Sequence, residues 1–150
     1  MATRSNIAYR TPEGKIRSVY CHWDGYPEHN GEMLTRYYTE ANKIAQLIEL
    51  GSLSSLRPEL GEKQDFDDRS TQNDDWTLAY HRDRGESLVI NEYDDIPSWI
   101  DDMEEYAYLW NGKEWLVNDH GKRDANGFPV FDFVDVAQRK DVMDSMGWDA

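Results

Sequence analysis

Apolar and polar residues alternate along two neighbouring stretches near the start of the chain, and this pattern predicts a β-hairpin. Residues 5–10 and 16–21 each change character at nearly every position, which is the period of a half-buried strand. The connection at 11–15 contains Pro12 and Gly14, and both residue types favour turns. We therefore expect two antiparallel strands at the beginning of the fold.

A second hairpin is predicted further along the chain, at 106–117. Two alternating segments rich in aromatic residues flank the pair Asn111-Gly112, which is a strong hairpin signal. Aromatic side chains on neighbouring strands can stabilise each other when they share one face of the sheet. We expect Tyr108 and Trp115 to form such a cross-strand pair.

Between these hairpins, apolar residues recur at three-and-four spacing and predict one long helix at about 31–50. Asn30 precedes the apolar stripe and is the expected N-cap, since its side chain can accept a backbone hydrogen bond. Gly51 follows the stripe, where a glycine commonly ends a helix in the left-handed conformation. The stripe needs a sheet on which to pack.

Weaker patterns predict several shorter elements, which are strands at 76–81, 87–93 and 130–134 and helices near 96–104 and 135–146. Residues 57–75 have almost no apolar content and are predicted to form a long surface loop. The fold class is therefore α+β. We expect a single domain over 1–150, with an antiparallel or mixed sheet and the long helix on one face.

Charge is distributed unevenly along the chain. The net charge is −14, and residues 57–105 hold sixteen acidic and five basic residues, so this middle third alone contributes −11. A field of this sign repels nucleic acid and membrane surfaces and attracts basic partners. No apolar run is long enough to span a bilayer, and the single cysteine fits a reducing compartment. We expect a cytoplasmic protein with no direct binding to nucleic acid or membranes.

Seven carboxylates, with no basic residue among them, occupy residues 92–105. They are Glu92, Asp94, Asp95, Asp101, Asp102, Glu104 and Glu105. Closely placed carboxylates can resemble a phosphate backbone to a basic groove, so these residues are the candidate surface for a basic protein partner. The alternative is a solvated face that keeps the protein soluble.

The turn predicted after residue 21 concentrates aromatic and polar side chains. Trp23 and Tyr26 can stack on a ring, and His22 and Asp24 can form hydrogen bonds, so these four residues are candidate ligand contacts. Cys21 and His22 are adjacent on a strand and point to opposite faces. They therefore cannot act together as a nucleophile and its base.

The sequence gives weaker support for a catalytic or metal-binding role of this turn. Cys21 would need a base from elsewhere, such as His81 or His120, and a metal site built from His22, Asp24 and His29 matches no zinc spacing. We expect no catalytic residue, no metal and no cofactor.

A basic cluster follows the strand predicted at 76–81. His81, Arg82 and Arg84 lie close together in an otherwise acidic region. Guanidinium groups suit phosphate or carboxylate recognition, so these residues are candidate contacts for a phosphate-bearing ligand. The alternative is that the arginines pair with neighbouring acids on the surface, where each pair contributes little.

Three stretches of the chain carry a family resemblance, at residues 18–27, 51–56 and 79–86, the first with the run Tyr20-Cys21-His22-Trp23-Asp24-Gly25-Tyr26-Pro27. Together with the predicted helix, they resemble a group of small phage and prophage proteins over roughly residues 5–90. The resemblance implies a mobile-element origin and a role inside the host cell during infection. It supplies no catalytic residue. As an analogy of class, small acidic phage proteins often inhibit host defence proteins, some by imitating DNA.

The leading hypothesis from the sequence is a non-enzymatic phage inhibitor. Its acidic middle third would occupy the basic surface of a host defence or nucleic-acid-handling protein. The alternative is a protein that sequesters a nucleotide or phosphate ligand, or a small hydrolase, using the turn at 22–26 and the basic cluster at 81–84. A virion accessory role and homo-oligomerisation both stay open.

Overall fold

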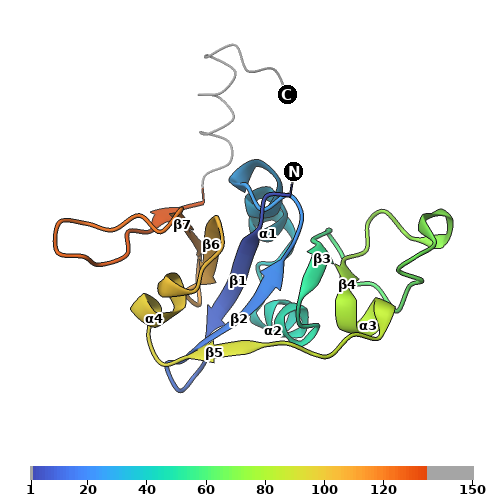
Figure 1. Cartoon of the computed structure of the whole chain (residues 1–150), viewed down its shortest axis with the longest axis horizontal. Helices are drawn as coiled ribbons and strands as arrows, with labels where there is room; N and C mark the ends of the chain where they lie inside the picture. The colour runs from blue at the N-terminus through green and yellow to red at the C-terminus, as the bar shows by residue number, and fades with distance from the viewer. Residues whose placement is uncertain (1, 135–150) are drawn as a thin grey trace, which may run out of the picture.

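A mixed sheet forms the centre of the fold in a computed structural model that describes residues 2–134. It contains eight strands in the order β4-β3-β2-β1-β6-β7-β8, and β5 pairs with β2 outside this order (Figure 1). The strands are β1 (Ser5–Arg10), β2 (Ile16–Cys21), β3 (Leu53–Ser55), β4 (Leu78–Ala79), β5 (Asn91–Tyr93), β6 (Tyr106–Trp110), β7 (Trp115–Asp119) and β8 (Asp132–Phe133). Because β1 pairs antiparallel with β2 but parallel with β6, the sheet is mixed. The predicted α+β class is confirmed.

Both predicted hairpins are present. The first joins β1 to β2 at the predicted bounds, and Gly14 takes φ +85° in its turn. The second joins β6 to β7, but its aromatic pairing differs from the prediction. Trp115 lies opposite Trp110, with ring centroids 5.5 Å apart, whereas Tyr108 lies opposite Val117. The four-residue connection at 111–114 determines this register, because it makes Trp110 and Trp115 the closing pair.

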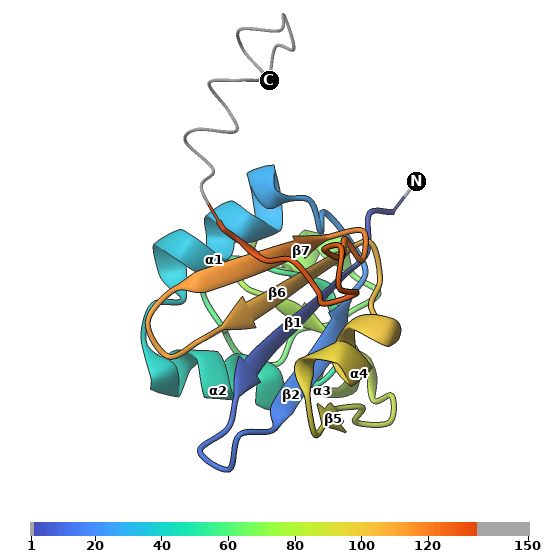
Figure 2. The same ribbon diagram turned by 90° about the vertical axis from the view of Figure 1, so that its left-hand side faces the viewer.

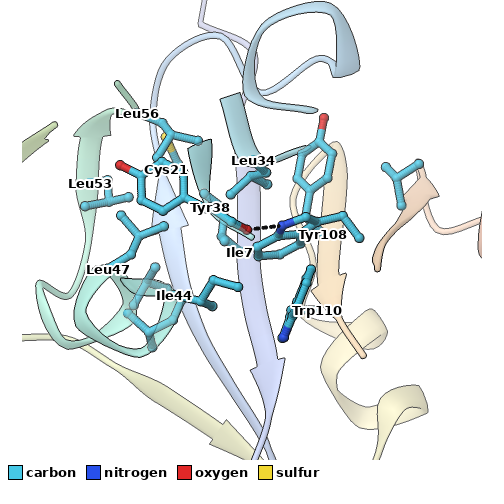
Figure 3. Close-up of a cluster of buried hydrophobic side chains, with 14 of the residues drawn as sticks. Ile7, Cys21, Leu34, Tyr38, Ile44, Leu47, Leu53, Leu56, Tyr108 and Trp110 are labelled. Atoms are coloured by element: carbon cyan, nitrogen blue, oxygen red, sulfur yellow. Dashed lines mark hydrogen bonds between the residues drawn. The ribbon is translucent and has the colours of Figure 1, made fainter. Parts of the chain in front are cut away.

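The prediction of one long helix at 31–50 is wrong. The segment forms a π-helical turn (Pro27–Gly31), helix α1 (Glu32–Tyr37) and a separate helix α2 (Ala41–Glu49). The chain leaves helical geometry at Tyr38, where φ is −124° and ψ is 68°. The Tyr38 carbonyl accepts a hydrogen bond from Trp115 Nε1 at 2.8 Å instead of one from a helical amide (Figure 3). The break lets both helices lie on the sheet.

Helices cover both faces of the sheet. Helices α1 and α2 lie on one face and α4 (Ile96–Asp101) lies on the other (Figure 2). Strand alternation divides the core accordingly, since Ile7 packs in the cluster with α1 and α2 while Ala8 packs in the cluster with Trp99 of α4. Gly51 ends the segment after α2 at φ +79°, as predicted. None of the helices within residues 2–134 is long and apolar enough to cross a membrane.

The elements predicted from weaker patterns are shorter than expected. The strand predicted at 76–81 covers only β4, because the chain turns into helix α3 (Tyr80–Arg84). The strands predicted at 87–93 and 130–134 are reduced to β5 and β8, and the helix near 96–104 ends at Asp101. The helix predicted at 135–146 lies outside the described residues. The 57–75 segment is a loop as predicted and has one short 3-10 turn at Arg69–Thr71.

Candidate functional site

A pocket of about 430 Å³ opens beside the end of β2, and we call it the Trp23 pocket. The turn after β2, strands β3 and β4 and the 57–75 loop form its walls. The lining residues are Trp23, Asp24, Ser54, Ser55, Arg57, Phe66, Arg69, Gln72 and Leu78. Small-molecule sites commonly have volumes of roughly 300–1,000 Å³. A hollow of about 470 Å³ at the other end of the sheet is bounded by Val134, where the described residues end, so the Trp23 pocket is the better-defined site.

The turn after β2 places Trp23 and Asp24 in this pocket. Trp23 N donates to Ser54 O at 3.0 Å, which continues the pairing of β2 with β3 beyond the strand itself. Asp24 then takes φ +57°, a left-handed conformation that aspartate tolerates better than most residues. Trp23 keeps 45% of its surface exposed and Tyr26 keeps 36%. Tyr26 donates from its hydroxyl to Asp24 Oδ1 at 3.2 Å.

A buried asparagine supports the turn from behind. Asn30 Nδ2 donates to Ser5 Oγ at 3.2 Å and to Trp23 O at 3.5 Å. Its expected role as a helix N-cap is wrong, because the helical segment already begins at Pro27 with the π-helical turn. Asn30 therefore holds the turn against β1, which fixes the position of Trp23.

Cys21 and His22 lie on opposite faces of β2, as strand alternation predicts. Cys21 is fully buried in the core cluster under α1 and α2. His22 Nδ1 forms a hydrogen bond with the Tyr20 hydroxyl at 2.6 Å, on the other face. Burial in apolar surroundings raises the pKa of the Cys21 thiol from about 9 to about 11. Cys21 is therefore a core residue.

Cys21 should resist alkylation in the folded protein. At about pH 8 we expect iodoacetamide to label it very slowly, because the thiol is both buried and protonated. The unfolded chain has the lower thiol pKa, so it releases the proton first and stability should fall as pH rises from about 9 to about 11. Mass spectrometry with and without denaturant measures the labelling. Rapid labelling of the folded chain would contradict the assigned burial.

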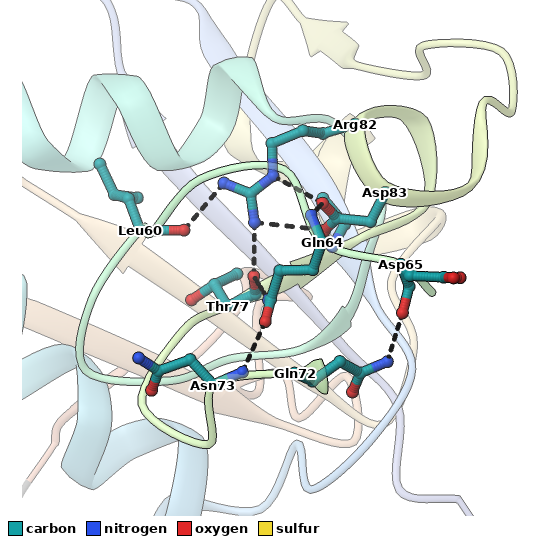
Figure 4. Close-up of polar contacts among 9 residues, drawn as sticks. Leu60, Gln64, Asp65, Gln72, Asn73, Thr77, Arg82 and Asp83 are labelled. Atoms are coloured by element: carbon teal, nitrogen blue, oxygen red, sulfur yellow. Dashed lines mark hydrogen bonds and ion pairs between the residues drawn. The ribbon is translucent and has the colours of Figure 1, made fainter. Parts of the chain in front are cut away.

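Arg82 holds the base of the 57–75 loop, although the sequence suggested it as a ligand contact (Figure 4). Its guanidinium donates to Leu60 O at 2.8 Å, to Thr77 O at 2.6 Å and to Asp83 Oδ1 at 2.9 Å. These bonds tie both ends of the loop to α3. Arg82 is thus engaged within the fold and does not line the Trp23 pocket.

Asp83 completes this anchor. Its side chain is fully buried and accepts from Gln64 N at 2.9 Å and from Ala79 N at 2.7 Å (Figure 4). Gln64 in turn accepts from Asn73 N at 2.8 Å through its side-chain oxygen. The acidic loop is therefore fastened at its base, and its pocket-lining residues are held in defined positions.

The other two members of the predicted basic cluster are exposed. His81 Nδ1 donates to Glu86 O at 2.6 Å. Arg84 Nε donates to Glu86 Oε2 at 2.6 Å, and the guanidinium carbon lies 4.3 Å from the centroid of the Phe66 ring. Phe66 lines the Trp23 pocket, so Arg84 lies directly behind its wall. His81 does not line it.

The predicted acidic surface extends along β5, α4 and the segment before β6. Glu92 and Asp94 lie 3.7 and 3.3 Å from Lys15 Nζ, and Asp101 pairs with Arg123 at 2.7 Å. The side chains of Asp94 and Asp101 nevertheless keep 87% and 70% of their surface exposed. Binding of a partner to this face stays a prediction.

Three of the four remaining acids of this block have structural contacts. Asp95 caps α4 by accepting from Ser98 N at 2.8 Å. Glu105 Oε2 accepts from Arg4 N at 2.7 Å, and the Glu104 amide donates to Asn6 Oδ1 at 2.6 Å. Asp102 is exposed at the end of α4.

No group of three or more metal-ligating side chains occurs in residues 2–134. The three residues considered from the sequence as metal ligands, His22, Asp24 and His29, do not form a metal site. His22 Nδ1 bonds to Tyr20, and His29 Nδ1 donates to Asn30 Oδ1 at 2.9 Å.

Of the nine residues that line the pocket, the sequence predicted only Trp23 and Asp24 as ligand contacts, and the most consequential of those it missed are in the 57–75 loop. Arg57, Phe66 and Arg69 come from a stretch with no periodic pattern, so nothing in it predicted a common pocket. Phe66 could have indicated that this segment packs against the fold, because it is the single aromatic residue in the polar 57–75 segment.

The three segments that we expected to resemble phage proteins meet at this site. Residues 18–27 provide Trp23, residues 51–56 provide Ser54, and residues 79–86 provide the anchor of the loop. No family model, curated protein or solved structure matches the chain. Function is therefore inferred from the geometry of the site.

Proposed function

We propose that the Trp23 pocket binds a small anionic ligand that carries an aromatic ring, of the nucleotide class. The observation that carries this proposal is the pair Arg57 and Arg69, which line one pocket from the start and the middle of the 57–75 loop. In residues 2–134, neither guanidinium has a carboxylate partner. The net charge of −14 makes unpaired arginines unusual here. Guanidinium groups recognise phosphate through paired, charge-assisted hydrogen bonds.

The other lining residues suit the rest of such a ligand. Trp23 and Phe66 are aromatic surfaces on which a base can stack, and stacking on one side chain is worth roughly 1–3 kcal/mol per base. The Asp24 carboxylate and the Ser54 hydroxyl can accept hydrogen bonds from a ribose or from the amino edge of a base. The pocket thus combines stacking, phosphate and hydrogen-bonding groups.

Isothermal titration calorimetry with AMP, GMP, CMP and UMP tests the proposal. We expect at least one mononucleotide to bind, and its nucleoside and inorganic phosphate to bind more weakly. Arg57→Gln and Arg69→Gln should each weaken binding by about 10-fold or more, since a hydrogen bond to a charged group is worth about 1.5–3 kcal/mol.

The matched control is Arg36→Gln, an exposed arginine on α1 outside the pocket. This variant should bind with unchanged affinity. Absence of binding for all four mononucleotides, or equal affinities for the pocket variants and the control, would count against the proposal.

A second candidate is the inhibitor inferred from charge. The high exposure of Asp94 and Asp101 favours it, because exposed carboxylates are available to a basic groove. Against it, the carboxylates of five of the seven acids already have the contacts described above. Inhibition of a basic partner is therefore less well supported than ligand binding in the Trp23 pocket.

Charge reversal on the acidic surface of residues 92–105 distinguishes specific binding of a basic partner from a general effect of net charge. Asp94→Lys, Asp101→Lys and Asp102→Lys together should abolish binding to a panel of basic DNA-binding domains in pull-downs at low salt. The control reverses Glu62, Asp67 and Asp74, which changes the net charge equally on the 57–75 loop. Equal binding by the two triple variants would reject a specific acidic face.

A further inference from the structure

A second cavity of about 310 Å³ lies next to the Trp23 pocket. Strand β2, Ser52 just before β3, helix α3 and the segment after it line the cavity. Its lining residues are Tyr20, Ser52, Tyr80, Arg84, Glu86, Ser87 and Val89. Like the first pocket, it combines aromatic rings, hydroxyl groups and an arginine.

One stack of side chains separates the two cavities. Phe66 lines the first cavity and Tyr80 lines the second, and their ring centroids are 5.3 Å apart. The Arg84 guanidinium lies over both rings, 4.3 Å from the centroid of Phe66 and 5.1 Å from that of Tyr80. A cation therefore lies at the boundary between two aromatic cavities.

A row of rings also joins the cavities on the β2 side. Trp23 contacts His22 edge to face, with centroids 4.6 Å apart, and His22 bonds to the Tyr20 hydroxyl. Trp23 belongs to the first cavity and Tyr20 to the second. Aromatic surfaces thus continue from one cavity to the other along two separate elements.

We infer that the ligand is a dinucleotide, with one base in each cavity and the linking phosphate at Arg84. This inference rests on the proposed function of the Trp23 pocket. The first base stacks on Trp23 and Phe66, and the second stacks on Tyr80. Arg84 now pairs with Glu86, but both side chains are more than 40% exposed. An exposed ion pair contributes little, so the guanidinium can exchange its partner for a phosphate.

Titration of mono- and dinucleotides on the whole chain tests the inference. The probes are AMP and GMP against the linear and cyclic dinucleotides of adenine and of guanine. We expect a dinucleotide to bind at least 10-fold more tightly than the matching mononucleotide. Arg84→Gln should remove most of this gain, so that it weakens dinucleotide binding more than mononucleotide binding. Glu86→Gln frees Arg84 and should preserve or increase the gain.

The outcomes distinguish this inference from the proposed function. Mononucleotide binding at Arg57 and Arg69 without any gain for dinucleotides would overturn the inference alone. An Arg84→Gln variant that loses affinity equally for both ligand types would also overturn it, since Arg84 would then act only by supporting Phe66. Failure of every nucleotide to bind would overturn the proposed function and the inference together.

Discussion

Replacing Asp83 with asparagine should lower the free energy of unfolding by about 3–5 kcal/mol. The Asp83 carboxylate is fully buried and accepts hydrogen bonds from Gln64 N, Ala79 N and Arg82. An asparagine removes the negative charge beside the Arg82 guanidinium and places an N–H donor among groups that are themselves donors. Both changes leave buried polar groups without suitable partners. Chemical denaturation followed by tryptophan fluorescence measures the effect.

Asp67→Asn provides the matched control for this prediction. It is the same chemical change, made at an exposed position of the 57–75 loop that Asp83 anchors. We expect it to alter stability by less than about 0.5 kcal/mol. If Asp83→Asn costs less than about 1 kcal/mol, the buried anchor does not hold the 57–75 loop, and the positions of Phe66 and Arg69 lose their support.

Replacing Trp99 with alanine should lower the free energy of unfolding by about 3–5 kcal/mol. Trp99 is 1% exposed and packs, with Ile100 of the same helix, in the core cluster between α4 and the sheet. Its indole Nε1 donates to Ser18 Oγ at 2.9 Å, so the substitution removes a buried hydrogen bond and creates a cavity. Thermal and urea denaturation both measure this loss of unfolding free energy.

Trp23→Ala is the informative comparison, because it removes the same side chain from an exposed position. We expect a change in stability of less than about 1 kcal/mol and a loss of nucleotide affinity of about 10-fold or more. Trp99→Ala, measured where the protein is still folded, should keep its affinity. A large loss of stability in Trp23→Ala together with a loss of nucleotide affinity in Trp99→Ala would mean that Trp23 belongs to the core and Trp99 to the site.

Local signals were sufficient to predict the two hairpins. Turn residues such as Gly14 and Asn111-Gly112 determine the backbone over a few positions, and the flanking alternation needs no distant partner. The aromatic pairing within the second hairpin depends on the length of the loop, which pairs Trp110 with Trp115.

The helix break at Tyr38 could not be predicted locally. The apolar stripe continues through it, and the break depends on partners far away in the sequence. Trp115 donates to the Tyr38 carbonyl, and the Tyr38 hydroxyl donates to the Arg57 carbonyl at 2.6 Å. Burial also raises the pKa of this hydroxyl to about 12, in keeping with its role as a donor.

The candidate site was predicted in part. Trp23 and Asp24 belong to the pocket because the turn chemistry around them is local. The sequence leaves Arg82 as a candidate ligand contact or a partner of neighbouring acids, because composition does not distinguish a guanidinium that binds phosphate from one that binds backbone carbonyls and a carboxylate. Arg57 and Arg69 reach the pocket only through the tertiary path of the loop.

Two-dimensional NMR of the indole groups during a nucleotide titration, with Trp23→Phe to assign the signal, tests nucleotide binding in the Trp23 pocket most directly. We expect the Trp23 Nε1–H signal to shift in a saturable manner. The Nε1–H signals of Trp99 and Trp115, which are bonded to Ser18 Oγ and Tyr38 O, should stay in place. A Trp23 signal that does not move at saturating nucleotide would contradict binding in the Trp23 pocket.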